Sequence, residues 1–362
     1  MKICLVCHKY AVPLDDPCCY PLGMMYVSTV LKSVGHSVKV LNYNLWDYDL
    51  KEEIKGQDLV GFTGFEEFFP YIKRDAAICK EMGINTILGG ALATFKTDEM
   101  AKYIDRIIVG EFDREGLNSA LCGWYPDYES FGIEEYHKRH SHRYMGVLTS
   151  RGCPYHCTFC AQTCKFQLRT IQNVLDEIDC YITKYDIETI IFNDNTFNLN
   201  KDRFIAICAG MKERKLRWGA AIRVVPWDEE MAKAAKESGC EYLVVGVESF
   251  NQVRLDMMNK QVTVDQITRC LDILNHYKIG YSGNILVGFE NDTFQDITNE
   301  VSSIPSRFKV FPTLVQPFIG TKNGHTRKLD KEQVDFLTNT FKEYVESCGK
   351  YLYPAIPEGG LQ

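Results

Sequence analysis

Three cysteines on one short segment are the residues of this chain best suited to chemistry. Cys153, Cys157 and Cys160 occur in the run TSRGCPYHCTFCAQ with the spacing C-x3-C-x2-C, directly after an apolar segment, 144–150, that predicts a short strand. Three thiolates this close on one loop can bind three irons of a 4Fe–4S cluster, which leaves the fourth iron without a protein ligand. Because substrates bind at open positions of catalytic metal sites, the loop predicts a cluster that does chemistry.

Two other interpretations of these cysteines stay open at this point. The chain has 15 cysteines in 362 residues, so some will be close in sequence by chance. Cys164 follows four residues after Cys160 and would complete a closed four-thiolate site, for example for zinc. Gly152 and Pro154 favour a tight loop directly after the strand, which supports the catalytic interpretation.

The composition is that of an ordinary globular protein. Hydrophobic residues make up 45% and charged residues 25%, and 362 residues are enough for two domains. No apolar run is long enough to cross a bilayer, and the N-terminus does not resemble a secretory signal. Many cysteines without such a signal predict a reducing, cytoplasmic location. The net charge of −7 argues against a large nucleic-acid surface, so neither nucleic acid nor a membrane is an expected partner.

The first half alternates strand-like and helix-like segments, which predicts a doubly wound parallel sheet of Rossmann-like type over 1–123. Expected strands cover 2–6, 37–41, 58–63, 86–88 and 106–109, and expected helices cover 24–34 and 70–82. Ligands of such sheets bind at the carboxyl ends of the strands. Those ends carry small residues that let a bulky ligand approach the backbone: Thr63, Gly64, Gly89, Gly90, Ala91, Gly110 and Glu111. No G-x-G-x-x-G run is present, so a nicotinamide cofactor is not supported.

The second half contains six consecutive strand-and-helix units, which predict a partial (β/α)6 barrel over 144–325. Expected strands cover 144–150, 188–193, 217–223, 242–247, 281–288 and 309–316, and expected helices cover 168–184, 202–214, 228–238, 263–277 and 293–304. Active residues of such barrels lie on the loops that follow the strands. Segment 124–143 is expected to be a linker, and 326–362 a C-terminal helix, 331–348, with an extended tail.

The cysteine loop resembles that of the radical S-adenosylmethionine (SAM) enzymes, whose loop has the pattern C-x3-C-x-aromatic-C, with Phe159 as the aromatic residue. The resemblance covers 144–320, and it implies a 4Fe–4S cluster whose free iron chelates the amino and carboxylate groups of SAM. It also implies roles for residues at the strand ends. Asp194 would receive the SAM ammonium, or would instead cap the helix that begins near Asn200.

The same resemblance implies further SAM contacts on the next strands. Arg223 would bind the carboxylate or the ribose with its guanidinium fork. Glu248 and Ser249, in the run VGVES, would hold the ribose hydroxyls. The backbone near Phe159 and Leu286 would contact the adenine edge, although the run GFENDT replaces the G-x-P-G-E-T of relatives.

The first half resembles the cobalamin-binding domain that precedes the radical SAM core in many enzymes. The matching runs are PLG at 21–23, GHSV at 35–38, DLVG at 58–61, GG at 89–90 and GE at 110–111. The resemblance implies a cobalamin cofactor, with contacts from Gly23, Thr63, Gly64, Gly89, Gly90, Ala91, Gly110 and Glu111. The D-x-H-x-x-G run that supplies an axial histidine elsewhere is absent, so a cobalt without a protein histidine is expected. The alternative is an empty Rossmann-like domain kept for packing or substrate binding.

Both halves together resemble the cobalamin-dependent radical SAM methyltransferases. The resemblance implies methylation of an unactivated carbon by way of methylcobalamin and a 5′-deoxyadenosyl radical, with a flavodoxin or ferredoxin as electron donor. The expected substrate is a protein or peptide residue, such as the glutamine of methyl-coenzyme M reductase, with a small molecule also compatible. Two other functions stay open: a cobalamin-dependent rearrangement or cyclisation without methyl transfer, and a non-catalytic corrinoid or Fe–S carrier.

Overall fold

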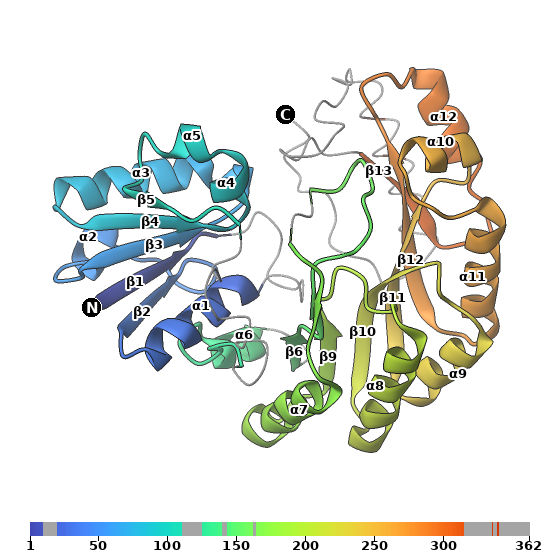
Figure 1. Ribbon diagram of the computed structural model, residues 1–362, viewed down its shortest axis with the longest axis horizontal. Coiled ribbons are helices and arrows are strands. Elements are labelled where there is room, and N and C mark those ends of the chain that lie inside the picture. The colour runs from blue at the N-terminus through green and yellow to red at the C-terminus, as the bar shows by residue number, and fades with distance from the viewer. Residues whose placement is uncertain are drawn as a thin grey trace. The chain divides into compact units, whose positions relative to one another are not determined.

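The computed structural model describes residues 1–9, 20–110, 125–139, 143–161 and 164–314, together with Asp335 and Asn339. The chain divides into two compact units, Met1–Arg143 and Tyr144–Gln362 (Figure 1). Glu111 and the expected C-terminal helix and tail, apart from those two residues, lie outside the described residues. Within the described segments, no helix is both long enough and apolar enough to cross a membrane.

The first unit is built on a five-stranded parallel sheet with the order β2-β1-β3-β4-β5. The strands are β1 (Lys2–Cys7), β2 (Ser37–Asn42), β3 (Leu59–Thr63), β4 (Asn85–Gly89) and β5 (Arg106–Ile107). The helices are α1 (Leu22–Ser33), α2 (Leu50–Glu53), α3 (Phe69–Glu81), α4 (Gly90–Phe95), α5 (Thr97–Met100) and α6 (Ile133–Arg139), with a 3₁₀ turn at Glu66–Phe68. The predicted α/β class with parallel strands is confirmed.

The inner strand β1 explains why helices cover both faces of this sheet. Residues 3–7 are all buried, as expected of a parallel strand packed on both sides. The Cys7 thiol contacts the Met24 sulfur of α1 at 3.7 Å. Its neighbour Val6 belongs to a core cluster that includes Ile72 of α3. Because successive strand residues point to opposite faces, α1 and α3 pack on opposite sides of the sheet.

The segment expected to be a linker packs onto the first unit instead. Its aromatic and apolar residues are almost completely buried: Tyr128, Phe131, Ile133 and Tyr136. The Asn42 amide at the end of β2 donates hydrogen bonds to the Phe131 carbonyl (2.9 Å) and the Tyr136 hydroxyl (3.2 Å). These bonds tie the segment to β2, which is an edge strand and presents backbone groups that need covering.

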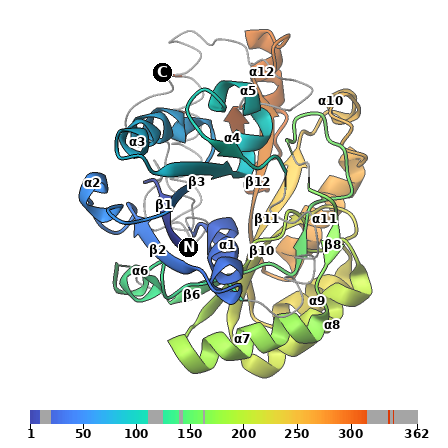
Figure 2. The ribbon, with the colours of Figure 1, turned by 60° about the vertical axis from the view of Figure 1, so that its left-hand side comes forward.

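The second unit contains a six-stranded parallel sheet in which the strands are adjacent in chain order, β13-β12-β11-β10-β9-β6. The strands are β6 (Tyr144–Val147), β9 (Thr189–Phe192), β10 (Arg217–Arg223), β11 (Cys240–Glu248), β12 (Gly280–Val287) and β13 (Val310–Leu314). The connecting helices are α7 (Ile171–Tyr185), α8 (Lys201–Arg214), α9 (Glu229–Glu237), α10 (Gln252–Met257), α11 (Val264–His276) and α12 (Phe294–Ser302). The long helices lie along one face of this sheet (Figure 1 and Figure 2).

Side-chain caps fix where these helices begin. The residue before each helix accepts a hydrogen bond from a backbone N–H of the first turn, as polar N-caps do. These caps are Thr170, Asn200, Asp228, Asn251, Thr263 and Thr293. The cap at Thr170 explains why α7 begins at Ile171 and not at 168, as the sequence predicted.

The first predicted strand of the second unit is broken. β6 ends at Val147, and a two-residue strand β7 (Ser150–Arg151) then pairs antiparallel with β8 (Gln167–Leu168). This small ribbon joins the two ends of the segment that contains the cysteines. The cysteine loop, residues 151–167, is thus closed at its base.

A buried ion pair lies at the carboxyl end of β1 in the first unit. His8 Nε2 is 2.9 Å from Asp75 Oδ2, and Arg74 Nε donates to Asp75 Oδ1 at 2.7 Å. Burial on its own would raise the pKa of Asp75, but the hydrogen bonds from His8 and Arg74 outweigh it, and the net pKa is lowered. The His8 ring is stacked among four aromatic rings: Tyr43, Phe62, Phe68 and Tyr71.

Asp75→Asn is expected to change how stability depends on pH. The lowered pKa of Asp75 stabilises the fold above the unfolded value of 3.8, and this contribution is lost as pH falls through the folded pKa. At pH 7 the variant should lose about 1–3 kcal/mol. Below about pH 4, the wild-type unfolding free energy should fall more steeply than that of the variant. Urea unfolding of the full chain at a series of pH values measures both, with Asp98→Asn on the exposed side of α5 as control. Equal acid slopes in wild type and Asp75→Asn would contradict the assignment.

Candidate functional site

The cysteine loop is anchored to the rest of the second unit at its base and at its tip. At the tip, Thr158 N donates to the Met258 carbonyl at 3.0 Å, and the Asn259 amide donates to the His156 carbonyl at 2.9 Å. Cys153 and Cys157 are half-buried, and Cys160 is exposed. The loop therefore presents its thiols toward space that a ligand can reach.

The three cysteines do not surround a single point. In the described part of the chain, no three His, Cys, Asp or Glu side chains are grouped as the ligands of one metal ion would be. In a 4Fe–4S cluster each thiolate binds a different iron, so its ligands are spread around the cluster. The assignment of Cys153, Cys157 and Cys160 to a cluster remains a prediction.

A second buried ion pair closes the base of the cysteine loop. Arg169 N donates to the Thr149 carbonyl at 3.0 Å, and its Nη1 donates to the Leu148 carbonyl at 2.7 Å. The same guanidinium forms an ion pair with Glu177 of α7, and both side chains are almost completely buried. Burial raises the pKa of Glu177, and Arg169 and the Tyr181 hydroxyl, which donates to it, counteract the rise. Arg169 thus fixes the exit of the loop to the end of β6.

Asp194 holds the same region from the next strand. Its carboxylate accepts hydrogen bonds from Thr149 N (2.6 Å), Thr149 Oγ1 (2.5 Å) and Ser150 Oγ (2.7 Å). Burial raises the pKa of Asp194, although these hydrogen bonds oppose the rise. The helix cap considered for Asp194 is supplied instead by Asn200, whose side chain accepts from Arg203 N at 2.9 Å. Asp194 therefore joins the ends of the first two strands of the sheet.

Arg223 extends from the end of β10 to the cysteine loop. Its guanidinium lies 3.7 Å from the centre of the Tyr155 ring, and Nη1 is 3.7 Å from Cys157 Sγ. Nη2 donates a short hydrogen bond to the Lys260 carbonyl. The structure brings Arg223 and Cys157 together, as their predicted roles at one site require.

Lys260 links several of the predicted residues, although the sequence analysis did not select it. Its Nζ lies 2.7 Å from Glu248 Oε1 and 5.9 Å from the centre of the Phe159 ring. Lys260 and Glu248 are both buried. Glu248 has a φ of +67°, an uncommon conformation for a residue other than glycine and one found often at functional sites. A lysine twelve residues after the strand end carries no local pattern that would have identified it.

Ser249 and Leu286 lie on neighbouring strand ends, and both bond to other protein groups. The Ser249 hydroxyl donates a short hydrogen bond to Glu300, whose pKa burial raises. The Leu286 carbonyl accepts from Arg254 Nη2 at 3.1 Å. Arg254 is in turn paired with Asp292 at 2.8 Å. This network shapes the loops after β11 and β12.

Several polar atoms on the strands of the second unit, or shortly after them, are buried without a hydrogen-bond partner among the described residues. They are Asn193 Oδ1, Arg223 Nε, Trp227 Nε1 and Asn284 Oδ1. A buried polar atom without a partner costs about 1–3 kcal/mol. Water or a polar ligand would satisfy such atoms.

The residues predicted for the first unit gather at the ends of β3 and β4. Thr63 Oγ1 donates to the Gly89 carbonyl at 3.4 Å. Gly90 has a φ of +81°, and a Cβ there would lie 2.5 Å from Thr63 Oγ1. Gly64 accepts at its carbonyl from Leu92 N at 2.9 Å. Ala91 follows in the first turn of α4.

The other two described residues of this set lie on different elements. Gly110 N donates to Thr94 Oγ1 of α4 at 3.0 Å, which makes Thr94 a neighbour that the sequence analysis missed. Gly23 is exposed in the first turn of α1, and a Cβ there would meet no atom within 4 Å. One edge of the first sheet, at the ends of β3 and β4, is thus formed by Thr63, Gly64, Gly89, Gly90 and Ala91.

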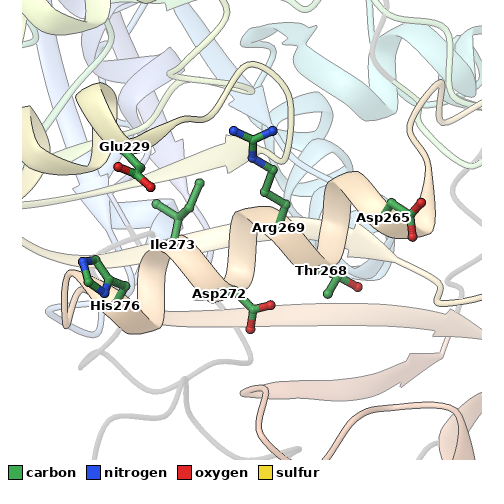
Figure 3. A pocket seen from close by; sticks show the side chains of 7 residues that line it. All are labelled: Glu229, Asp265, Thr268, Arg269, Asp272, Ile273 and His276. Atoms are coloured by element: carbon green, nitrogen blue, oxygen red, sulfur yellow. The ribbon is translucent and has the colours of Figure 1, made fainter.

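An open groove of about 430 Å³ lies on the outer helical layer of the second unit (Figure 3). Its side chains come from α9 and α11: Glu229, Asp265, Thr268, Arg269, Asp272, Ile273 and His276. None of the predicted site residues lines it. The groove is therefore separate from the strand ends.

The chain is similar to several known proteins. The model of the radical SAM superfamily matches residues 147–302. An uncharacterised methyltransferase of Pyrococcus horikoshii is 26% identical over 356 residues, covering 83% of this chain and 77% of that protein. An anaerobic magnesium-protoporphyrin IX monomethyl ester cyclase of Cereibacter sphaeroides is 30% identical, covering 75% and 54%. A bacteriochlorophyllide d C-12(1)-methyltransferase of Chlorobaculum tepidum is 26% identical, covering 83% and 72%.

Solved structures share the fold. The radical SAM methyltransferase TsrM of Kitasatospora setae, with cobalamin and a 4Fe–4S cluster bound, is similar with a TM-score of 0.70 at 17% identity, covering 89% of this chain and 74% of that one. The cobalamin-dependent radical enzyme OxsB, with aqua-cobalamin and SAM bound, gives a TM-score of 0.65 at 17% identity, covering 96% and 56%. Residues 147–302 thus match the radical SAM superfamily, and the chain is similar over most of its length to methyltransferases and in fold to cobalamin-dependent radical SAM enzymes.

Proposed function

We propose that this protein transfers a methyl group to an unactivated carbon atom with a 4Fe–4S cluster, SAM and cobalamin as its cofactors. The observation that carries the proposal is the anchored cysteine loop, whose Cys157 contacts a strand-end arginine. The cofactors of its solved neighbours support the same set. The six parallel strands of the second unit would serve as the partial barrel of the family.

The residues of the second unit fit a cluster and SAM. Three thiols on one loop are the donors that a cluster with one open iron needs. Arg223 places positive charge beside the loop, 3.7 Å from Cys157 Sγ, where a cluster bound by thiolates would carry negative charge. The polar atoms without partners on the strand ends would be satisfied by the polar groups of SAM.

The predicted SAM contacts differ in how they would act. Arg223 would bring its positive charge to the SAM carboxylate or ribose while Nη1 and Nη2 stay engaged by Cys157 and Lys260. Glu248 would hold the ribose while it shares its carboxylate with Lys260. Asp194 already accepts three hydrogen bonds, so we propose that its main contribution is to hold the two strand ends in place.

The first unit fits a large ligand at the edge formed by Thr63, Gly64, Gly89, Gly90 and Ala91. Gly90 leaves no room for a Cβ there, so the backbone itself is the surface that a ligand would meet. We propose that cobalamin binds along this edge. His8 is buried and tied to Asp75, so it would have to leave this pair to bind cobalt.

When bound, the cofactors supply a 5′-deoxyadenosyl radical that removes a hydrogen atom from carbon, and a cobalt-carried methyl group. The chain's own residues bind and orient these groups, and no acid–base pair is needed for a carbon that is not acidic. A low-potential one-electron donor, such as a flavodoxin or ferredoxin, would reduce the cluster. Binding and orienting the cofactors would account for the many polar and charged side chains at this site.

The relatives favour a small molecule as the substrate. The names of two describe work on bacteriochlorophyllide and on magnesium-protoporphyrin ester, and one TsrM structure contains tryptophan as substrate. We therefore propose a small-molecule substrate in place of the glutamine of methyl-coenzyme M reductase predicted from sequence. None of these three names describes a protein residue as the substrate.

One observation favours a second function. The cyclase of Cereibacter sphaeroides is 30% identical to this chain, whereas the methyltransferases of Pyrococcus horikoshii and Chlorobaculum tepidum are each 26% identical. Cyclisation without methyl transfer would use the same cluster and SAM contacts. The chain spans 54% of the length of that cyclase, so the comparison bears on the shared part alone.

An assay with SAM that contains an isotopically labelled methyl group separates these functions. The reconstituted, reduced enzyme is incubated with an extract of small molecules as the source of substrate. We expect the label to appear in one of these molecules and 5′-deoxyadenosine to be formed at the same time. Deoxyadenosine without label in any product would favour cyclisation. Label in a protein fraction, detected by mass spectrometry, would restore the protein substrate. Neither deoxyadenosine nor labelled product, in the presence of a full cluster, would contradict the proposal and indicate a carrier.

Gly152→Ala is expected to lower the cluster content. Gly152 has a φ of +69°, and a Cβ there would lie 2.4 Å from the Cys164 carbonyl oxygen, so the loop must shift by displacing backbone. Such strain costs about 1–3 kcal/mol. Iron and sulfide per chain after anaerobic reconstitution should fall well below wild type. Gly56→Ala, with a φ of +72° but no atom within 4 Å of its Cβ, tests the backbone effect alone. Wild-type iron content in Gly152→Ala would show that the loop does not depend on this contact.

A further inference from the structure

We propose that Arg223 raises the reduction potential of the cluster by donating a hydrogen bond to the sulfur of Cys157. This role goes beyond SAM binding and rests on the proposed function, because it requires that Cys157 be a cluster ligand. Arg223 would then be a positioning and tuning residue that acts on the cluster through its ligand.

Hydrogen bonds fix the backbone of Arg223 independently of the contacts of its side chain. Asn198, which is fully buried, accepts from Arg223 N at 2.9 Å and donates to the Arg223 carbonyl at 2.8 Å. One side chain thus holds both sides of the residue at the end of β10. The arginine is 5% exposed, so its guanidinium has little freedom to turn toward solvent.

Two contacts orient the guanidinium, and the orientation places a third group, Nη1, beside the cysteine sulfur. The guanidinium Cζ is 3.7 Å from the centre of the ring of Tyr155, a residue between Cys153 and Cys157 in the loop. Nη2 is held by the Lys260 carbonyl. Because the fork is rigid, these two contacts fix the direction of Nη1, which lies 3.7 Å from Cys157 Sγ and within hydrogen-bonding distance for sulfur.

Neighbouring polar groups are less suited to this role. Thr196 Oγ1 is 3.7 Å from Cys153 Sγ, but its proton is given to the Asn195 carbonyl at 2.7 Å. The charge of Lys260 is offset by Glu248. No carboxylate in the described segments forms an ion pair with Arg223, so its positive charge beside the loop is not neutralised there.

The effect on the cluster follows from charge. The oxidised [4Fe–4S]2+ cluster accepts one electron from an external low-potential donor and becomes [4Fe–4S]1+, with more negative charge on its sulfur ligands. A donor and a positive charge at one of these sulfurs stabilise the reduced form more than the oxidised form, so the potential rises. Burial strengthens the effect because the local dielectric is low.

The test is a redox titration of the cluster followed by electron paramagnetic resonance, on full-length reconstituted protein without SAM. Omitting SAM removes any effect of Arg223 on cosubstrate binding. Arg223→Gln should shift the one-electron equilibrium about tenfold toward the oxidised form, a midpoint potential lower by about 59 mV. Arg223→Lys keeps the charge but lacks the fork, and should fall between Arg223→Gln and wild type. Arg214→Gln is the matched control, because that arginine is mostly buried but pairs with Asp179 on the outer helices.

The outcomes separate this inference from the proposed function. A wild-type protein that binds no cluster would overturn the proposed function itself. A full cluster with unchanged potential in Arg223→Gln would overturn the tuning role and leave the function intact. Loss of the cluster in both Arg223 variants, measured as iron and sulfide per chain, would also overturn it, since the arginine would then only hold the loop. A potential shift in Arg214→Gln of equal size would show that the effect is not specific to Cys157.

Discussion

The arrangement of the second unit depends on two buried ionisable side chains at the base of one loop. Arg169 ties the exit of the cysteine loop to the end of β6 and is neutralised by Glu177. Asp194 ties the entry of the same loop to the end of β9. Breaking a buried ion pair by removing one partner typically costs about 3–5 kcal/mol. This ion pair and the hydrogen bonds of Asp194 together let a loop with half-exposed thiols keep one shape, which a cluster with an open iron requires.

Two of the cations near the loop are neutralised by carboxylates, and Arg223 has no carboxylate partner among the described residues. Lys260 is matched by Glu248, and Arg254 by Asp292. Arg223 has aromatic, carbonyl and sulfur neighbours, but no carboxylate among the described residues. The structure thus keeps a free positive charge at the position where thiolates and a reduced cluster would concentrate negative charge. This distribution agrees with a site for electron transfer.

Local sequence patterns predicted the regular helices and strands. They did not predict features that depend on contacts with residues distant in the sequence. The strand at Arg217–Arg223 has the predicted bounds, because its apolar run and its neighbours agree. The strand expected over 144–150 is broken because Thr149 and Ser150 bond to Asp194, which is more than 40 residues away. The three cysteines could be recognised from the sequence because they all lie on one loop. Lys260 could not be recognised in this way, because its partners Glu248 and Phe159 come from other segments.

The two units follow one topological rule with different chemistry. In both, the predicted ligand residues follow parallel strands, where backbone N–H groups and short loops converge. The edge in the first unit is made of Thr63, glycines and Ala91, so it offers backbone to a large ligand and asks little of side chains. The edge in the second unit carries Arg223, Glu248 and Lys260, together with buried polar atoms that lack partners. A charged ligand with several hydrogen-bonding groups suits the second edge, and a large ligand held by shape suits the first.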